Sequence, residues 1–156
     1  MKKFVSLLFC FLALSLCACN SAAANKTVDM DALSQAMLAA DASLPEMKST
    51  TAASDLQYVA DLDDKKVDRY FLHYSAVATA DEIAVIAMKD AADVDDAQDA
   101  LQAHLEHRYR LFAEYEPKEV QRIENAVIFT KAQYAVLIIC DNADAVQATF
   151  ENAFND

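Results

Sequence analysis

Glycine is absent from all 156 residues of the chain, and proline occurs only twice. Glycine supplies the positive backbone φ angle and the close backbone approach used by phosphate-binding loops, dinucleotide-binding turns and the nucleophile elbow. None of these motifs can therefore be present in its usual form. Tight turns are expected to use Asn, Asp, Lys or Gln instead.

Basic residues are scarce as well. The chain has 13 Lys and Arg residues against 25 Asp and Glu residues, a formal net charge of −12. This balance argues against nucleic acid as a partner, since binding phosphates requires a basic face. It also argues against adhesion of the domain itself to an anionic lipid surface. The acidic surface is expected mainly to solvate the protein, with only weak attraction for cationic ligands or metal ions.

The first nineteen residues carry the most specific signal. Lys2 and Lys3 precede an apolar run, Phe4 to Leu16, that is too short for a full membrane span. The run ends in Leu16-Cys17-Ala18-Cys19, and the segment resembles a bacterial lipoprotein signal. We expect residues 1–18 to be removed, Cys19 to be lipidated and residues 19–28 to form a tether. Two acyl chains suffice for lasting attachment, whereas one is marginal. Ordinary secretion with a cut after Ala18 is the alternative.

The cysteine count indicates a fold without disulfides. Of Cys10, Cys17, Cys19 and Cys140, two leave with the signal and Cys19 would carry the lipid. Cys140 alone remains, so no internal disulfide is possible and the fold depends on its apolar core. Cys140 ends an apolar run and is expected to be a small core residue. Cleavage also removes Lys2 and Lys3, which leaves a charge of 11 − 25 = −14.

Hydrophobic periodicity places the elements of a single domain over residues 29–156. A helix is expected to begin after Asp29 and to end at Pro45, followed by a loop over 46–53 and a short helical turn from Ser54. Two strands are then expected over 69–74 and 83–88, joined by residues 77–81, followed by a helix over 92–115 that Pro117 breaks. After a short turn over 118–124, two more strands are expected over 126–130 and 134–140, joined by residues 131–133. A last helix is expected after Asn142.

This order, α-ββα-ββα, predicts an α+β fold with a four-stranded antiparallel sheet and packed helices. Two strands are apolar on both faces, which is typical of strands that are covered on both sides. Exposure of Val136 and Ile138 would leave a large apolar patch. We therefore expect the N-terminal helix to cover the second face, with a partner molecule as the alternative.

Several segments resemble one known family. They are Asp81-Glu82-Ile83-Ala84-Val85 with the long helix after it, Tyr115-Glu116-Pro117, Asn125-Ala126-Val127 and Tyr134-Ala135-Val136-Leu137. The family is a group of small lipoproteins of clostridia and related Firmicutes, described as a domain of unknown function. The resemblance covers roughly residues 29–154, and it implies the localisation and the domain extent. It implies no catalytic or binding residue.

The histidines suggest metal binding or catalysis only weakly. His104 and His107 are three positions apart on the long helix and could face one metal ion, but no further ligands are evident. The simpler interpretation places them on a polar helix flank. His73 lies in an apolar strand, where a structural role with one hydrogen bond is expected, and no recognisable motif pairs it with Ser or Cys. We predict no metal site, no cofactor and no catalytic residue.

Acidic and aromatic residues provide two further candidates. Five aspartates lie near the start of the long helix: Asp90, Asp93, Asp95, Asp96 and Asp99. They lack the glycine and the terminal glutamate of a calcium loop, and aspartate is favoured at a helix start by capping and by the helix dipole alone. The aromatic residues Tyr70, Phe71, Tyr74, Tyr109, Phe112 and Tyr115 could line a ligand cleft, although such residues more often belong to a core.

The sequence therefore predicts a lipoprotein on the outer face of a Gram-positive cytoplasmic membrane. Its expected function is that of a non-catalytic binding or interaction module of the cell envelope, with an envelope protein as a potential partner. The alternatives are an envelope hydrolase or a subunit of one, and a ligand-capture accessory of a transporter. The sequence favours a binding protein over an enzyme but identifies neither ligand nor partner.

Overall fold

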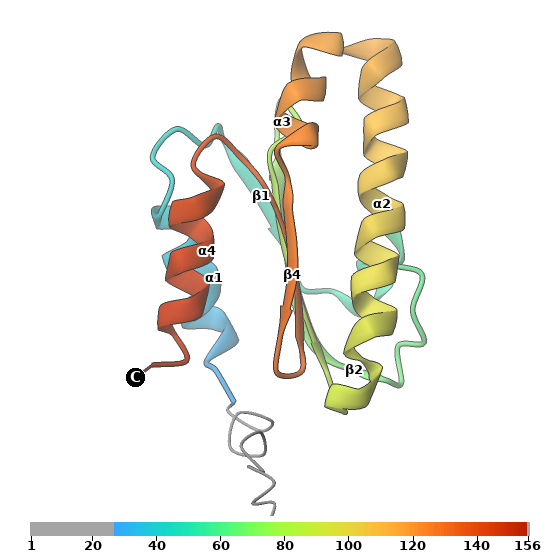
Figure 1. The fold of residues 1–156 in the computed structure, drawn as a ribbon, viewed down its shortest axis with the longest axis vertical. Coiled ribbons are helices and arrows are strands. Elements are labelled where there is room, and N and C mark those ends of the chain that lie inside the picture. The colour runs from blue at the N-terminus through green and yellow to red at the C-terminus, as the bar shows by residue number, and fades with distance from the viewer. Residues whose placement is uncertain (1–26, 156) are drawn as a thin grey trace, which may run out of the picture.

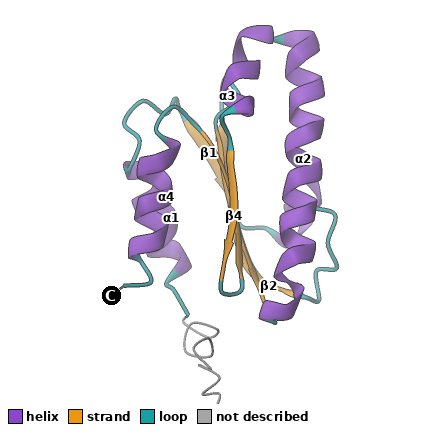
Figure 2. Ribbon diagram, in the orientation of Figure 1, coloured by secondary structure: helices purple, strands orange, loops and turns teal. Residues whose placement is uncertain are grey.

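A central antiparallel sheet with helices on both faces makes up the described part of the chain, residues 27–155 of a computed structural model (Figures 1 and 2). The elements are α1 (Met30–Ala39), β1 (Met47–Thr50), the 3-10 helix η1 (Ala53–Tyr58), β2 (Val67–Ser75), β3 (Glu82–Met88), the 3-10 helix η2 (Ala91–Asp93), α2 (Val94–Tyr115), the 3-10 helix η3 (Pro117–Glu119), α3 (Val120–Glu124), β4 (Val127–Lys131), β5 (Tyr134–Ile139) and α4 (Ala143–Asn152). The predicted signal peptide, Cys19 and most of the tether lie outside the described residues.

The sheet has five strands in the order β1-β2-β3-β5-β4, so the prediction of four strands was wrong. The additional strand is β1, which lies in the segment predicted as a loop over 46–53. It pairs antiparallel with the last part of β2, from Met47 opposite Ser75 to Thr50 opposite Leu72. The sequence Met-Lys-Ser-Thr gives little indication of a strand. A short edge strand pairs with only one neighbour and remains largely exposed, so it does not need the apolar pattern by which a strand is predicted.

Both predicted hairpins are confirmed, β2 with β3 and β4 with β5. The second hairpin turn has two residues rather than three, since Lys131 pairs with Tyr134. Ala132 occupies this turn with a φ angle of 52°, the only positive φ angle of a non-glycine residue in the described chain. Gln133, the other turn residue, is of an expected type, whereas Ala132 is not, and the absence of glycine leaves a strained position at Ala132.

Two hydrophobic layers enclose the sheet. On one face α2 packs over side chains such as Ala84, Ile86 and Leu137, with Leu101 fully buried. On the other face α1 and α4 cover Val85 and its neighbours (Figure 1). Full burial of a side chain such as Leu101 stabilises the fold by roughly 2 kcal/mol. The N-terminal helix thus covers the second face as expected, but it shares that role with the C-terminal helix.

Hydrogen bonds at the two ends of α1 determine where this helix begins and how it is tied to α4. The side chain of Asp29 accepts hydrogen bonds from the backbone N–H groups of Asp31 and Ala32, at 3.0 and 3.1 Å, so Asp29 is the N-cap and the helix begins after it as predicted. The helix ends at Ala39, before the predicted stop at Pro45. Beyond it, the buried Asp41 accepts a hydrogen bond from Asn142 N at 3.1 Å and thereby ties the end of α1 to the start of α4.

The long helix is confirmed as α2, preceded by the single turn η2. No helix within residues 27–155 combines the length and the apolar character needed to cross a membrane. Cys140 is a free, buried thiol, as expected for a core residue. Burial, together with the neighbouring Asp41 carboxylate, raises the pKa of this thiol to about 12.

Candidate functional site

A cavity of about 340 Å³ lies between η1 and α2, above the sheet. Thr50 of β1 stands opposite Leu72 of β2, and Tyr74 of β2 stands opposite Glu82 of β3, so these four side chains share the face of the sheet toward α2. They form the floor of the cavity. The walls come from the two helices: Asp55, Tyr58, Val59, His104 and Arg108.

Glu82 is the most deeply placed charged group of this cavity, with a side chain only 2% exposed. Its Oε1 atom lies 2.7 Å from Nε2 of His104, and its Oε2 atom lies 3.3 Å from Nε of Arg108. His104 and Arg108 are one helical turn apart on α2, so both side chains reach the same carboxylate. A buried carboxylate therefore positions an imidazole and a guanidinium at the wall of the cavity.

Further contacts fix Arg108. Its Nη2 atom donates to the backbone oxygen of Ala80 at 2.9 Å, and its guanidinium carbon lies 4.9 Å from the centre of the Phe112 ring. Such cation–π contacts and carboxylate contacts together hold the side chain in one orientation. Arg108 Nε itself has no hydrogen-bond partner in the described chain, so Glu82 holds Arg108 as an ion pair while Ala80 and Phe112 orient the guanidinium.

A second, more open cavity of about 830 Å³ continues along α2 and shares Tyr58, Val59 and His104 with the first. We call the two together the η1–α2 groove. Its acidic lining residues are Asp55, Asp61, Asp63, Glu82, Asp96 and Asp99, against two basic residues, Lys66 and Arg108. The formal charge of the groove is therefore 2 − 6 = −4 with neutral histidines. Tyr58, whose side chain is 71% exposed, stands at its rim.

Asp81, the residue before Glu82, takes part in a separate ionic cluster. Arg122 Nη1 lies 2.8 Å from both Asp81 Oδ2 and Glu119 Oε2, and Arg122 Nη2 lies 3.1 Å from Asp141 Oδ1. Burial raises the pKa of Asp81. Burial alone would lower the pKa of Arg122, but the three carboxylates outweigh it and raise that pKa.

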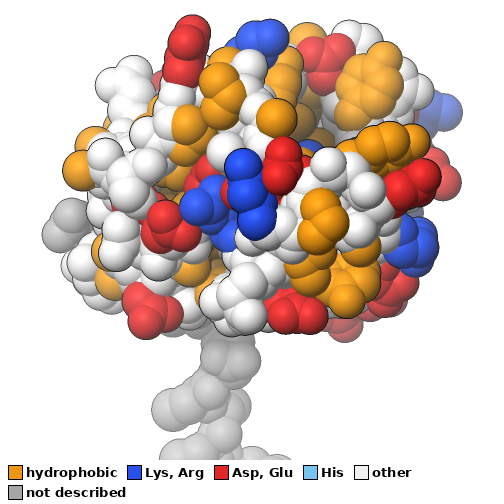
Figure 3. All heavy atoms as spheres, turned by 90° about the horizontal axis from the view of Figure 1, so that it is seen from above, with side chains coloured by type: hydrophobic (Ala, Val, Ile, Leu, Met, Phe, Trp, Pro, Cys, Tyr) orange, Lys and Arg blue, Asp and Glu red, His pale blue; other side chains and the backbone are white. Residues whose placement is uncertain are grey.

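This Arg122 cluster ties the β2–β3 turn to α3 and to the end of β5. The Glu119 carboxylate also accepts a hydrogen bond from Ala80 N at 3.0 Å. Figure 3, viewed onto the end of the molecule where α2 finishes, shows basic side chains at the centre of this face with acidic side chains beside them. Because each carboxylate of this cluster has Arg122 as its ion-pair partner and the cluster joins three segments of the chain, we assign it a structural role.

His73 lies on the opposite face of the sheet from the groove and is 2% exposed. Its Nε2 atom is 2.8 Å from Ser34 Oγ of α1, and its Nδ1 atom is 2.6 Å from Ser49 Oγ of β1. The expectation of a single hydrogen bond was therefore wrong, since both ring nitrogens have a serine partner. Burial lowers the pKa of His73 to about 4, so the ring is neutral at pH 7. One nitrogen then donates and the other accepts.

The other predicted candidates are only partly brought together. His104 and His107 both line the groove, but no group of three or more His, Cys, Asp or Glu side chains within residues 27–155 is arranged to hold a metal ion. Asp90 caps η2, while Asp93 and Asp96 bind Lys66 at 2.8 and 3.0 Å. These hydrogen bonds raise the pKa of Lys66.

The six aromatic candidates do not form one cleft. Tyr74 lines the groove, whereas Phe71 belongs to the core on the opposite face and Tyr70 to the core beneath η1. Phe112 packs against the same core as Tyr70. Tyr109 and Tyr115 are exposed. The aromatic residue at the groove that sequence reasoning missed is Tyr58. Sequence reasoning also missed the Glu82–His104–Arg108 cluster, although an acid in an apolar strand and a basic pair four residues apart on a helix were visible signals.

A family model described as a domain of unknown function, DUF4358, matches residues 40–140, which span β1 to β5, the Glu82–His104–Arg108 cluster and the Arg122 cluster except Asp141. The chain therefore belongs to this family, in agreement with the resemblance to a domain of unknown function. No curated protein and no solved structure shows significant similarity to the chain. The matched region includes the groove but neither α1 nor α4.

Proposed function

We propose that this DUF4358 chain is a lipid-anchored binding module of the cell envelope, and that the η1–α2 groove is its ligand site. The observation that carries the binding function is the groove itself. It combines a cavity of about 340 Å³, an exposed aromatic side chain and a buried, ion-paired Glu82. Ligand sites typically pair such a concave surface with a few fixed polar groups.

The anchor is proposed from the sequence. Lys2, Lys3 and the apolar run before Leu16-Cys17-Ala18-Cys19 support lipidation of Cys19, with residues 1–18 removed. The protein would then lie on the outer face of the cytoplasmic membrane, as in the clostridial and other Firmicutes lipoproteins that the sequence resembles. Cys19→Ala should move the protein from the membrane fraction to the soluble fraction. Retention of an uncleaved Cys19→Ala protein in the membrane would contradict anchoring by the lipid.

The charge of the groove indicates the class of ligand. With six acidic and two basic lining residues, the groove favours a ligand that carries positive charge. Lys66 and Arg108 already bind carboxylates of the protein, whereas the side chains of Asp61 and Asp99 have no ion-pair partner within the described chain. Tyr58 adds an aromatic surface on which an ammonium group can stack. We therefore propose an elongated amine as the ligand class.

Isothermal titration calorimetry with 1,8-diaminooctane tests this proposal, with 1,8-octanediol as the uncharged ligand of equal length. Tyr58→Ala should weaken diamine binding about fivefold, since a cation–π contact contributes roughly 1 kcal/mol. Tyr115→Ala is the matched control, because Tyr115 is 72% exposed but lies outside the groove. Equal binding of the diol, or equal losses in the two variants, would contradict a cationic ligand in this groove.

One observation favours a hydrolytic enzyme as the second candidate. Nε2 of His104 is hydrogen-bonded to Glu82, whereas no described side chain bonds Nδ1 of His104. Nδ1 is therefore available to accept a proton. A carboxylate-oriented imidazole at a cavity wall is a common arrangement for general-base catalysis. Hydrolysis of p-nitrophenyl acetate by the purified protein, with His104→Gln as the comparison, tests this candidate. Equal rates for the two proteins would contradict it.

A further inference from the structure

We propose that the free edge of β2 is a strand-addition site for an extended, basic segment of a partner protein. β2 runs from Val67 to Ser75, but β1 pairs only with Leu72 to Ser75. No strand within residues 27–155 pairs with the outer side of residues 67–71, because β1 is the edge strand and ends at Thr50. Unpaired strand edges are the usual sites at which a peptide extends a sheet.

The direction of the backbone groups follows from two hydrogen bonds. Ser75 N donates to Asp81 O at 3.0 Å, toward the β3 side, and Ala76 N donates to Glu46 O at 2.7 Å, toward the β1 side. Backbone groups alternate between the two sides of an antiparallel strand. Between Arg69 and Ala76, beyond the register shift at Val67–Arg69, the even-numbered residues therefore face β1, and the N–H and C=O groups of Tyr70 point to the side from which β1 is missing.

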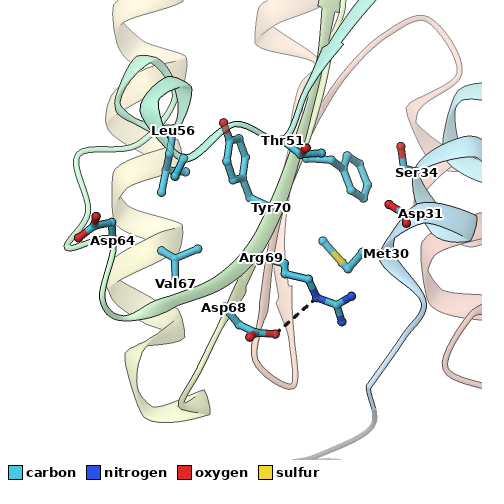
Figure 4. Close-up of a pocket in the computed structure, with 12 residues that line it drawn as sticks. Met30, Asp31, Ser34, Thr51, Leu56, Asp64, Val67, Asp68, Arg69 and Tyr70 are labelled. Atoms are coloured by element: carbon cyan, nitrogen blue, oxygen red, sulfur yellow. Dashed lines mark ion pairs between the residues drawn. The ribbon is translucent and has the colours of Figure 1, made fainter.

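A cavity of about 340 Å³ lies along this part of β2, between α1 on one side and η1 on the other (Figure 4). Met30 of α1 and Phe71 provide apolar surface on one side, and Leu56 of η1 and Val67 provide it on the other. Side chains of an added strand alternate between two faces, so each face has an apolar wall to contact. We call this cavity the β2 slot.

The charged residues that line the β2 slot indicate that the partner segment is basic. Asp31 and Asp64 line it, and neither carboxylate has a hydrogen bond or ion pair within the described chain. Asp68 and Arg69 pair with each other, with 3.6 Å between Oδ2 and Nε, as the dashed line in Figure 4 shows. The two unpaired carboxylates flank the free backbone edge. A strand that carries lysine or arginine would place opposite charges beside them.

The rest of this sheet edge is protected against strand addition. β1 has only four residues, Pro45 lies just before it, and Lys48 is exposed on it. Short length, proline and lysine are the features that block pairing at natural sheet edges. The β2 slot is lined by no proline and no lysine, and the register shift of β2 against β3 lies at Val67–Arg69, so the proposed pairing is centred on Tyr70. This site is separate from the η1–α2 groove, and the inference does not depend on the ligand proposed there.

Binding of three blocked pentapeptides to the full-length protein tests the proposal by calorimetry and hydrogen exchange. The probes are Val-Lys-Val-Lys-Val, Val-Glu-Val-Glu-Val, and the lysine peptide with alternate backbone nitrogens methylated. The lysine peptide should bind, and it should slow exchange of the Tyr70 amide. The methylated peptide should bind about tenfold more weakly, because it cannot donate the strand hydrogen bonds.

Variants separate the β2 slot from general attraction to an acidic protein. Asp31→Asn and Asp64→Asn should each weaken the lysine peptide about two- to fivefold. Asp144→Asn, an exposed aspartate on α4, should leave binding unchanged. Absence of binding by the lysine peptide, equal binding of the glutamate or methylated peptide, or an unchanged Tyr70 amide would overturn the proposal.

Discussion

Lowering the pH from 7 to 5 is expected to weaken the fold through His73. This imidazole is 2% exposed, bonds Ser34 and Ser49, and has a pKa of about 4 in the folded chain against 6.5 in an unfolded chain. Between these two values the unfolded chain binds a proton that the folded chain does not. Stability from the neutral ring is therefore present above pH 6.5 and is lost as the pH falls toward 4.

The size of the effect follows from the two pKa values. A shift from 6.5 to about 4 is worth roughly 3 kcal/mol when it is fully expressed. Between pH 7 and pH 5 the linkage relation gives a loss of about 2 kcal/mol in the free energy of unfolding. This is a large share of the stability of a domain of this size. Mild acid should thus lower the urea midpoint clearly.

Urea unfolding followed by circular dichroism at pH 7, 6 and 5 measures this loss for the natural chain and for His73→Gln. Glutamine can also bond the two serines but does not titrate. The other two histidines, His104 and His107, are present in both proteins, so their contributions cancel in the difference. The natural chain should lose about 2 kcal/mol more than the variant. Parallel losses, or an NMR titration that places the pKa of His73 near 6.5, would refute the reasoning.

Three further predictions concern single side chains. Glu82→Gln should destabilise the fold by about 3 kcal/mol in urea, because Arg108 is left buried without its carboxylate, whereas the exposed Glu106→Gln should change stability by less than about 0.5 kcal/mol. Ala132→Gly should raise stability by about 1 kcal/mol in the same assay, since glycine adopts a φ angle of 52° without strain, and a loss would contradict the turn geometry. Because burial raises the pKa of Cys140 to about 12, this thiol should react with a disulfide reagent at pH 8 only after unfolding, and rapid labelling of the folded chain would contradict its burial.

Hydrophobic periodicity predicted those helices and strands whose own residues show the spacing of a helix or a strand. Four strands, α2 and α4 follow from runs of apolar residues at strand or helix spacing. β1 could not be predicted in this way, because Met47 to Thr50 form a strand only where β2 offers them a partner edge. The early end of α1 has a similar cause, since Asp41 leaves the helix to cap a segment more than 100 residues later.

The site residues depend even more on tertiary structure. His104 and Arg108 belonged to a predicted helix, but their common partner, Glu82, comes from a strand that only folding brings beneath them. His73 acquires its two serine partners from α1 and β1, which are distant in the sequence. No local motif encodes such clusters. The Asp-Glu-Ile-Ala-Val segment pointed to the family, but its two acids gave no sign that they would join different arginines.

The position of α1 determines how the domain responds to mechanical load. A pull on the N-terminal end of the described chain acts first on Val28, which is buried and donates its amide to Tyr134 Oη at 3.1 Å. It acts next on the packing of Met30, Leu33 and Met37 of α1 against the sheet and α4. Detachment of α1 would also break the hydrogen bond between Ser34 and His73. The strands of the sheet would remain hydrogen-bonded to each other at that stage. Under tension α1 is therefore expected to detach before the strands of the sheet separate.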